Sequence, residues 1–202
     1  KFPATLLLRA IGYSSNKEIL EVFGLTDTYK ISKTKDLINK TLLEDLVNTD
    51  TGEVIDESGL IITESKLSQW KKSGIKELTV AMKENSMEVQ MLKNTIEKDP
   101  TKNSGEALML LYQHLRTGEA PTLDVARKFI EKMFFSTKKY DLGAVGRYRI
   151  NKKFDLHAPV EEPILIHDDF IHVFKYIILM RKGEKGPDDI DHLGNRRVRT
   201  VG

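Results

Sequence analysis

The chain has 202 residues, of which 40% are hydrophobic, so it can bury a substantial core and is not a generally disordered protein. Its 32 Lys and Arg residues nearly balance 30 Asp and Glu residues, which excludes a polycationic tail protein. The absence of cysteine excludes disulfides, thiolate metal sites and cysteine nucleophiles.

Two short helices are predicted at the beginning of the chain. Pro3 and Gly12 favour a helix between them, because proline fits the first helical turn and glycine readily ends a helix. Ser14 or Ser15 is predicted to cap a second helix over residues 17–23.

The middle of the chain is predicted to contain the strands. Turn residues flank the apolar runs 54–55 and 60–62, which predicts small antiparallel strands there. A further strand is predicted over residues 75–82, after a helix over residues 64–73. Residues 30–46 have a weak helical spacing of apolar side chains, so another helix is expected before the strands.

The second half of the chain is predicted to be mostly helical. Apolar side chains recur at helical intervals in residues 87–97, 104–116, 123–135 and 168–180. Residues 141–154 contain two glycines among many basic residues and are expected to be partly extended.

Charge is distributed unevenly along the chain. Residues 36–64 contain eight acidic residues and one basic residue, a local net charge of −7. Residues 127–153 contain nine basic and two acidic residues, a local net charge of +7. A polyanion is therefore expected to approach the second half of the chain.

The basic stretch over residues 138–153 also contains aromatic side chains. Tyr140 and Tyr148 lie among its Lys and Arg residues, and interleaved aromatic rings and cations suit nucleic acid. A solvated basic face is the alternative interpretation of the same pattern.

Three aspartates crowd a short segment near the end of the chain. Asp188, Asp189 and Asp191 offer the oxygen ligands that hard cations prefer. The alternative is a solvated acidic loop that pairs with Arg196 or Arg197.

Four longer strings carry a family resemblance. They are PATLLLRAIGY (3–13), GEAPT (118–122), FFSTKKYDLGAVGRYRINKK (134–153) and DDIDHLGNRRVRTVG (188–202). In this order they closely resemble the β subunit of bacterial DNA-directed RNA polymerase. The resemblance is good over residues 3–23 and 99–202 and weaker over 47–80. Ala120 stands where the family usually has proline, and residues 24–46 form a shorter stretch than in many members.

The resemblance implies an α+β fold, namely a mostly helical lobe domain with a small antiparallel β-sheet. It also implies a division of the chain into four parts. These are the N-terminal helices of the lobe (1–23), a variable and shortened α+β subdomain (24–98), the helical lobe core (99–187) and a loop that leads to the protrusion domain (188–202).

The resemblance further implies a non-catalytic wall of the DNA cleft that contacts the melted nontemplate strand. In the family, positions matching Ile190, Asp191 and Arg196 belong to a pocket for an unpaired guanine, and Arg116 matches an arginine that approaches the same strand. A carboxylate can accept hydrogen bonds from guanine N1–H and the exocyclic amine together, and these donors are exposed only in an unpaired base. The expected DNA-binding residues are Arg116, Ile190, Asp191, Arg196, Arg197 and Arg199.

The partners follow from the same resemblance. They are DNA, as the nontemplate strand and the downstream duplex, the polymerase subunits β′, α and ω, and a σ factor. No cofactor is expected in this chain, because the catalytic Mg²⁺ is bound by β′ in the family. With no membrane-length apolar run and no secretory signal, the chain is expected in the cytoplasm, without membrane contact.

Two other classes of function remain open. One is a protein-interaction module that docks a σ factor or a regulator, which the acidic region 36–64 favours. The other is a metal-dependent nuclease built on the three aspartates. Because the chain starts without methionine and stops within a basic run, it is expected to be a piece of a larger protein.

Overall fold

The first two helices form within one residue of the bounds that the sequence predicts. The computed structural model describes residues 1–32, 34–48, 51–82, 86–116, 122–189 and 191–192. Helix α1 (Ala4–Ile11) ends at Gly12, whose φ of 135° suits a residue without a side chain. Helix α2 (Asn16–Val22) starts with a capping box, in which the Ser15 hydroxyl and the Glu18 carboxylate each accept a backbone hydrogen bond from the other residue.

Two antiparallel pairs of strands form the sheet part of the fold. Strand β1 (Thr26–Lys30) pairs along all five residues with β4 (Glu77–Ala81). Strand β2 (Leu46–Val47) pairs with β3 (Val54–Asp56), which confirms the strand predicted over residues 54–55. The strand predicted over residues 60–62 does not form, and Ile61 makes only an isolated antiparallel bridge with Thr41. The helices of this part are α3 (Thr34–Leu37) and α4 (Glu64–Lys72).

The prediction of a helix over residues 30–46 is wrong. Among its described residues only the four of α3 are helical, and an isolated bridge joins Leu42 to Val80 of β4. Strand β1 was not predicted, because its polar sequence lacks the alternation of apolar and polar residues that marks a strand. Its partner β4 supplies the buried side chains of this pair instead.

Trp70 lies at the centre of the core of the strand part. Its side chain is fully buried, and its Nε1–H donates to Oδ2 of Asp56 at 2.7 Å. Lys66 Nζ, also on α4, donates to Oδ1 of the same carboxylate at 2.5 Å. This one aspartate of β3 therefore fastens α4 to the strands. The buried residues around Trp70 are Ile31, Leu37, Leu42, Leu46, Ile62, Leu67, Leu78 and Val80.

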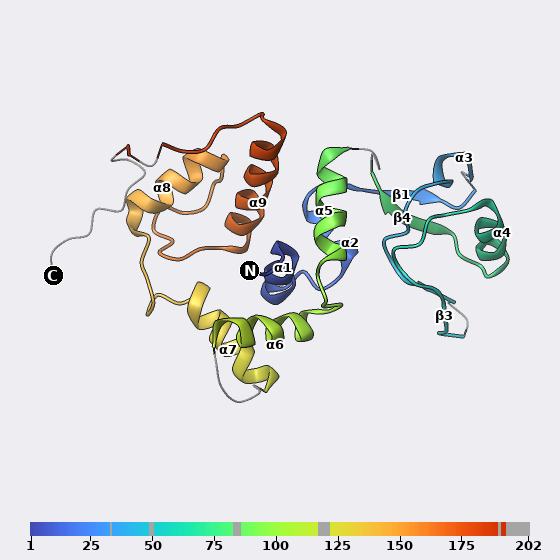
Figure 1. Cartoon of the computed structure of the whole chain (residues 1–202), viewed down its shortest axis with the longest axis horizontal. Coiled ribbons are helices and arrows are strands. Elements are labelled where there is room, and N and C mark those ends of the chain that lie inside the picture. Colours follow the sequence, from blue (N-terminus) through green and yellow to red (C-terminus); the bar gives the residue numbers. More distant parts are fainter. Residues whose placement is uncertain (33, 49–50, 83–85, 117–121, 190, 193–202) are drawn as a thin grey trace.

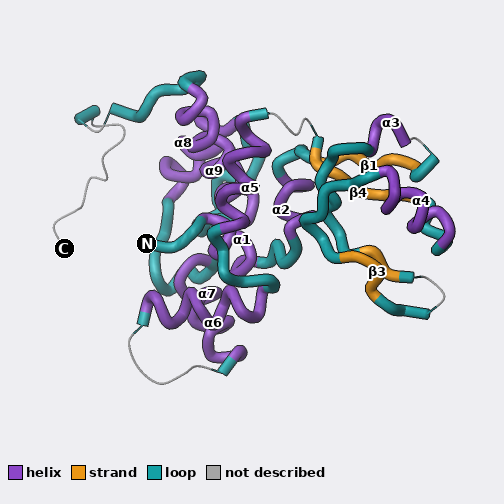
Figure 2. Tube along the Cα trace, turned by 45° about the vertical axis from the view of Figure 1, so that its right-hand side comes forward, coloured by secondary structure: helices purple, strands orange, loops and turns teal. Residues whose placement is uncertain are grey.

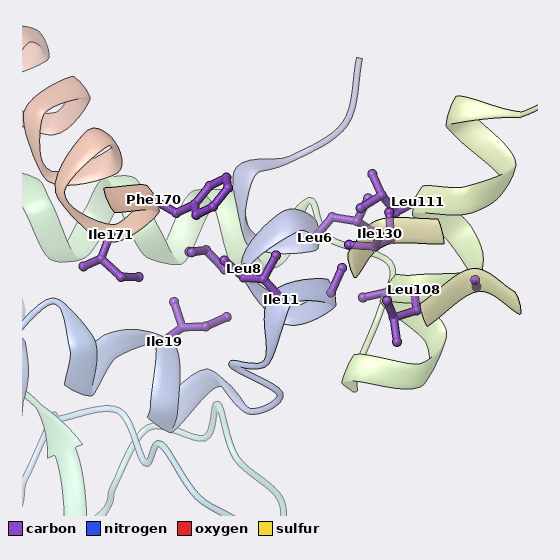
Figure 3. Packing of buried hydrophobic residues seen from close by; sticks show 12 residues of the cluster. Leu6, Leu8, Ile11, Ile19, Leu108, Leu111, Ile130, Phe170 and Ile171 are labelled. Atoms are coloured by element: carbon purple, nitrogen blue, oxygen red, sulfur yellow. The ribbon is translucent and has the colours of Figure 1, made fainter. Parts of the chain in front are cut away.

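A second core lies among the helices, with α1 at its centre. The helices α5 (Met87–Glu97), α6 (Ser104–Leu115) and α7 (Leu123–Phe134) form where helical spacing predicts them. Figure 3 shows Leu6 of α1 pointing toward Leu111 of α6 and Ile130 of α7, and Leu8 pointing toward Phe170. The first residues of the chain thus share one hydrophobic core with segments more than 100 residues away.

The prediction that residues 141–154 are partly extended is also wrong, because residues 143–154 form a helix. Helix α8 (Gly143–Phe154) packs on α9 (His167–Lys182) through a buried ion pair. Arg147 Nη1 donates to both carboxylate oxygens of Asp169, at 2.8 and 2.9 Å. Because the residue that anchors α8 is charged, the apolar pattern of the sequence does not reveal its buried face.

The described elements form a helical part and a strand part, with α2 and α5 where the two meet (Figures 1 and 2). A third group of buried residues, which includes Leu20, Leu43 and Ala81, packs where they join. At the same junction Lys17 pairs with Glu44 at 2.7 Å. The predicted α+β class with a small antiparallel sheet is confirmed, and the division into four parts stays a prediction. No helix in the described ranges has the length and apolar character needed to cross a bilayer.

Candidate nucleic-acid interface

The segment that follows α9 is turned back by the end of that helix. Gly183 adopts a left-handed conformation with φ of 79°, and the backbone N–H groups of Gly183 and Glu184 donate to carbonyls of the last turn. This is a Schellman-type ending, which satisfies carbonyls that would otherwise lack partners. Hydrogen bonds to Glu184 and Glu88 raise the pKa of Lys182, so this last residue of α9 stays charged.

The same segment is fastened to both α8 and α9. Tyr176 Oη of α9 donates to the carbonyl of Gly186 at 2.8 Å. Lys153 Nζ of α8 pairs with Asp188, and it also lies 4.2 Å from the centroid of the Tyr176 ring. Lys153 is therefore held by a carboxylate and an aromatic face together, which favours one position for the start of the loop.

Asp191 is the predicted guanine-reading residue that lies within the described structure. Its side chain is exposed, and its backbone N–H donates to Oδ1 of Asp189 at 2.9 Å. This bond is an Asx-type turn, in which an aspartate side chain orders the backbone two residues on. The other predicted residues of this segment, Ile190, Arg196, Arg197 and Arg199, lie outside the described residues.

Arg116 lies in a different place from Asp191. It follows the last turn of α6, is exposed, and its guanidinium carbon lies 5.2 Å from the centroid of the Phe129 ring of α7. Figures 1 and 2 both show α6 and α7 at the opposite end of the helical part from the segment after α9. The structure thus does not bring these two predicted residues into one pocket.

The basic stretch over residues 138–153 divides into internal and external side chains. Tyr140 is internal, because its hydroxyl donates to the carbonyl of Phe134 and accepts the backbone N–H of Leu165 at 2.9 Å. Arg147 is internal as well, through its ion pair with α9. Tyr148 has 54% of its surface exposed and remains on the outside. Of the two tyrosines in the stretch, only Tyr148 is therefore available for contact with nucleic acid.

The three aspartates do not form a metal centre in the described structure. Asp188 is paired with Lys153, and Asp189 accepts the backbone bond of Asp191. Among the residues that the structure describes, no group of three His, Cys, Asp or Glu side chains is placed to hold a metal ion. The interpretation as an acidic loop that pairs with a cation holds for Asp188, whose partner among the described residues is Lys153. The pairing predicted with Arg196 or Arg197 lies outside the described residues.

The sequence does not reveal the roles of two residues in this arrangement. In the sequence Lys153 is one cation of the basic stretch, and Tyr176 lies in a helix that is apolar on one side. Their roles depend on contacts with a segment that lies 10 to 35 residues further along the chain. No short-range pattern signals such contacts.

Comparison with known proteins confirms the resemblance. A family model described as RNA polymerase Rpb2, domain 2, matches residues 1–199. The chain is similar to the DNA-directed RNA polymerase subunit beta of three bacteria. Over 221 aligned residues it is 40% identical to that of Flavobacterium psychrophilum, 39% to that of Phocaeicola vulgatus and 38% to that of Bacteroides fragilis. Each alignment covers 100% of this chain and 17% of the relative, so the chain spans about one sixth of their length. The chain therefore belongs to the RNA polymerase β-subunit family, in which it corresponds to the domain described as Rpb2 domain 2.

Proposed function

We propose that this domain is the non-catalytic lobe of a bacterial RNA polymerase β subunit. It forms one wall of the DNA cleft and contacts the melted nontemplate strand. The observation that carries this proposal is the exposed Asp191 carboxylate on a segment that is fastened to two helices. A residue that distinguishes bases has to be held in place, because a hydrogen-bond pair discriminates only when its geometry is fixed.

The chemistry assigned to Asp191 is acceptance of two hydrogen bonds from an unpaired guanine. The N1–H and the exocyclic amine of guanine point the same way, and a carboxylate presents two matching acceptors. The Arg196 guanidinium is proposed to donate hydrogen bonds to an acceptor edge of the base or to a neighbouring phosphate. Arg116, Arg197 and Arg199 are assigned phosphate contacts, which orient the strand without reading its sequence.

The proposed partners are those of a polymerase subunit. They are DNA, as the nontemplate strand and the downstream duplex, the β′, α and ω subunits, and a σ factor. The proposed location is the cytoplasm. The catalytic Mg²⁺ is assigned to β′, and this domain contributes no ligand to it.

The test is a measurement of open-complex lifetime with assembled polymerase. Templates differ only at the nontemplate base that Asp191 is proposed to read. Asp191→Ala is expected to reduce the advantage of guanine by about 1–3 kcal/mol, with a smaller loss of overall promoter affinity. Arg196→Ala is expected to weaken the same preference, and also the affinity for every sequence if it contacts a phosphate.

Glu161→Ala is the matched control, because Glu161 is an exposed acidic residue of the helical part outside the loop. It is expected to leave the preference for guanine unchanged. If the guanine advantage persists in Asp191→Ala, the pocket is wrongly assigned and the segment is a structural brace.

A second candidate function is a docking module for a σ factor or a regulator. The observation that favours it is the exposure of three apolar side chains in the acidic region of the strand part, those of Val47, Val54 and Ile61. Val47 and Val54 lie opposite each other in the β2–β3 pair. However, Glu44 and Asp56 of this region already form ion pairs within the domain. If docking is the main role, Val54→Lys weakens σ or regulator binding and leaves the guanine preference intact.

A further inference from the structure

Helix α8 has an outward face on which four side chains gather. Residues 145, 148, 149 and 152 are spaced by three or four positions and therefore share one side of the helix. Val145 is 71% exposed and Tyr148 54% exposed, and Arg149 and Lys152 are also exposed. On the other side Arg147, Ile150 and Phe154 face the rest of the helical part, with Arg147 fully buried. We call the outward group (Val145, Tyr148, Arg149 and Lys152) the α8 face.

The polar side chains of the α8 face have no partners within the described structure. No hydrogen bond, ion pair or ring contact joins Tyr148, Arg149 or Lys152 to another described residue. By contrast, the other cations of α8 are engaged, Arg147 with Asp169 and Lys153 with Asp188. Two solvated cations and an open aromatic ring are thus displayed together.

The charge of the helix points to an anionic occupant. Helix α8 contains four Lys and Arg residues and no acidic residue. The nearest acid before it, Asp141, is engaged in an Asx-type turn, because its Oδ1 accepts the backbone N–H of Gly143 at 2.7 Å. A surface with positive charge of this kind attracts a polyanion.

The exposed ring decides between a duplex and an unpaired strand. Phosphates of a duplex satisfy Arg149 and Lys152, but the stacked bases of a duplex offer no face to Tyr148. An unpaired strand offers both, because its phosphates reach the cations while a base stacks on the ring. Val145, in the same row, adds an apolar contact for a base or sugar.

The α8 face lies beside the segment that carries Asp191. Lys153 directly follows Lys152 of this face in the sequence, and it pairs with Asp188. Figure 1 shows the segment after α9 passing next to α8. From this geometry we infer that the α8 face is a second contact for unpaired DNA, along which the strand runs next to the Asp191 segment. The inference rests on the proposed function, since it takes DNA to lie on this side of the lobe.

The direct test is site-specific crosslinking in assembled polymerase. A photoreactive phenylalanine derivative replaces Tyr148, and open complexes are irradiated with each DNA strand labelled separately. The expected result is a crosslink to an unpaired DNA strand that is absent before the promoter melts. Crosslinking to RNA, to duplex DNA or to another protein subunit overturns the inference.

The second measurement is the lifetime of the open complex across a range of salt concentrations. Arg149→Glu/Lys152→Glu is expected to shorten the lifetime on all sequences and to reduce the slope of log lifetime against log salt by about 1.4, or about 0.7 for each phosphate contact of a single strand. Tyr148→Ala is expected to shorten the lifetime about tenfold, whereas Tyr148→Phe retains the ring and is expected to resemble the unaltered enzyme.

The matched control is Lys71→Glu/Lys72→Glu, an equal charge reversal at exposed residues of α4 in the strand part. If this control and the α8 variant change the lifetime equally, the α8 face has no specific role.

The guanine preference is measured in the same complexes and separates the two proposals. If Asp191→Ala leaves the preference intact while the α8 variants shorten the lifetime, the guanine pocket fails and the α8 contact stands. The reverse pattern overturns the α8 contact alone.

Discussion

Arg147 shows how a single charged residue determines the packing of two helices. Its side chain and that of Asp169 are 0% and 2% exposed, so each charge depends on the other for solvation. The carboxylate also accepts the backbone N–H of Ile166 at 2.8 Å, at the start of α9. One buried pair therefore fixes the position of α8 and the start of α9.

Arg147→Met is expected to lower the free energy of unfolding by about 3–5 kcal/mol, because it leaves the Asp169 carboxylate buried without a counter-charge. Urea unfolding checks this value. Glu88→Gln is the control, since it removes a partly exposed pair with Lys182, and exposed pairs of this kind contribute little to stability. The double variant Arg147→Met/Asp169→Leu is expected to recover part of the loss. Equal losses in Arg147→Met and the control contradict this account.

Asp56 gives the strand part a dependence on pH. Burial raises the pKa of this carboxyl, but hydrogen bonds from Lys66 and Trp70 and the charge of Lys66 outweigh burial and lower the pKa below its ordinary value. A lowered pKa in the folded state means that the stabilisation is present at neutral pH. It is lost as the pH falls below about 4 and through the folded-state pKa.

Asp56→Asn is therefore expected to lower the free energy of unfolding by about 1.5–3 kcal/mol at pH 7 and to have little effect near pH 2. Trp70 is the only tryptophan of the chain and contacts this carboxyl, so its fluorescence follows the unfolding of this part directly. Glu57→Gln, a change at an exposed neighbour, is expected to have no such pH dependence. A loss at pH 2 as large as at pH 7 contradicts the assignment.

At the scale of the elements, the sequence predicts those helices that bury an apolar stripe. Helices α6 and α7 place apolar residues against α1 at regular intervals, and helical spacing alone identifies them. Helical spacing does not identify α8, because Arg147 occupies the most buried position of this helix and pairs with Asp169, 22 residues further along the chain. The apolar pattern does not identify strand β1 either, because β1 forms by pairing with β4, about 50 residues further along the chain. Both errors arise where a distant contact outweighs the local pattern.

The candidate site follows the same division. The acidic segment and the basic stretch are visible in the sequence, and the family resemblance assigns a role to Asp191. The sequence does not show that Lys153 and Tyr176 fasten this segment, nor that Tyr140 is internal while Tyr148 is exposed. These facts depend on which side chains the helices turn inward. They follow from the way in which α8 and α9 pack against each other.

At the scale of the whole molecule, several of the cations that the sequence contains are held in ion pairs within the domain. Arg9 and Arg147 are buried with Asp99 and Asp169, and several lysines pair with carboxylates at the surface. Those surface lysines are Lys17, Lys66, Lys153 and Lys182. Of the nine cations in residues 127–153, Arg147 and Lys153 are engaged in this way, so the net charge left there for a polyanion is lower than the local value of +7.

Binding of this domain alone to DNA is accordingly expected to be weak and sensitive to salt. Each neutralised phosphate of a single strand adds roughly −0.7 to the slope of log K against log salt, and few cations reach phosphates at once. Fluorescence anisotropy with a labelled single-stranded oligonucleotide measures this slope, which is expected to be shallower than about −6. Arg149→Glu/Lys152→Glu is expected to make it shallower still, whereas Lys71→Glu/Lys72→Glu on α4 is expected to change it little. A steeper slope means that more of the basic surface is available than the ion pairs of the fold allow. Tight binding that does not respond to salt contradicts a role for the domain as one wall of a cleft, because such a wall holds DNA only together with the other polymerase subunits.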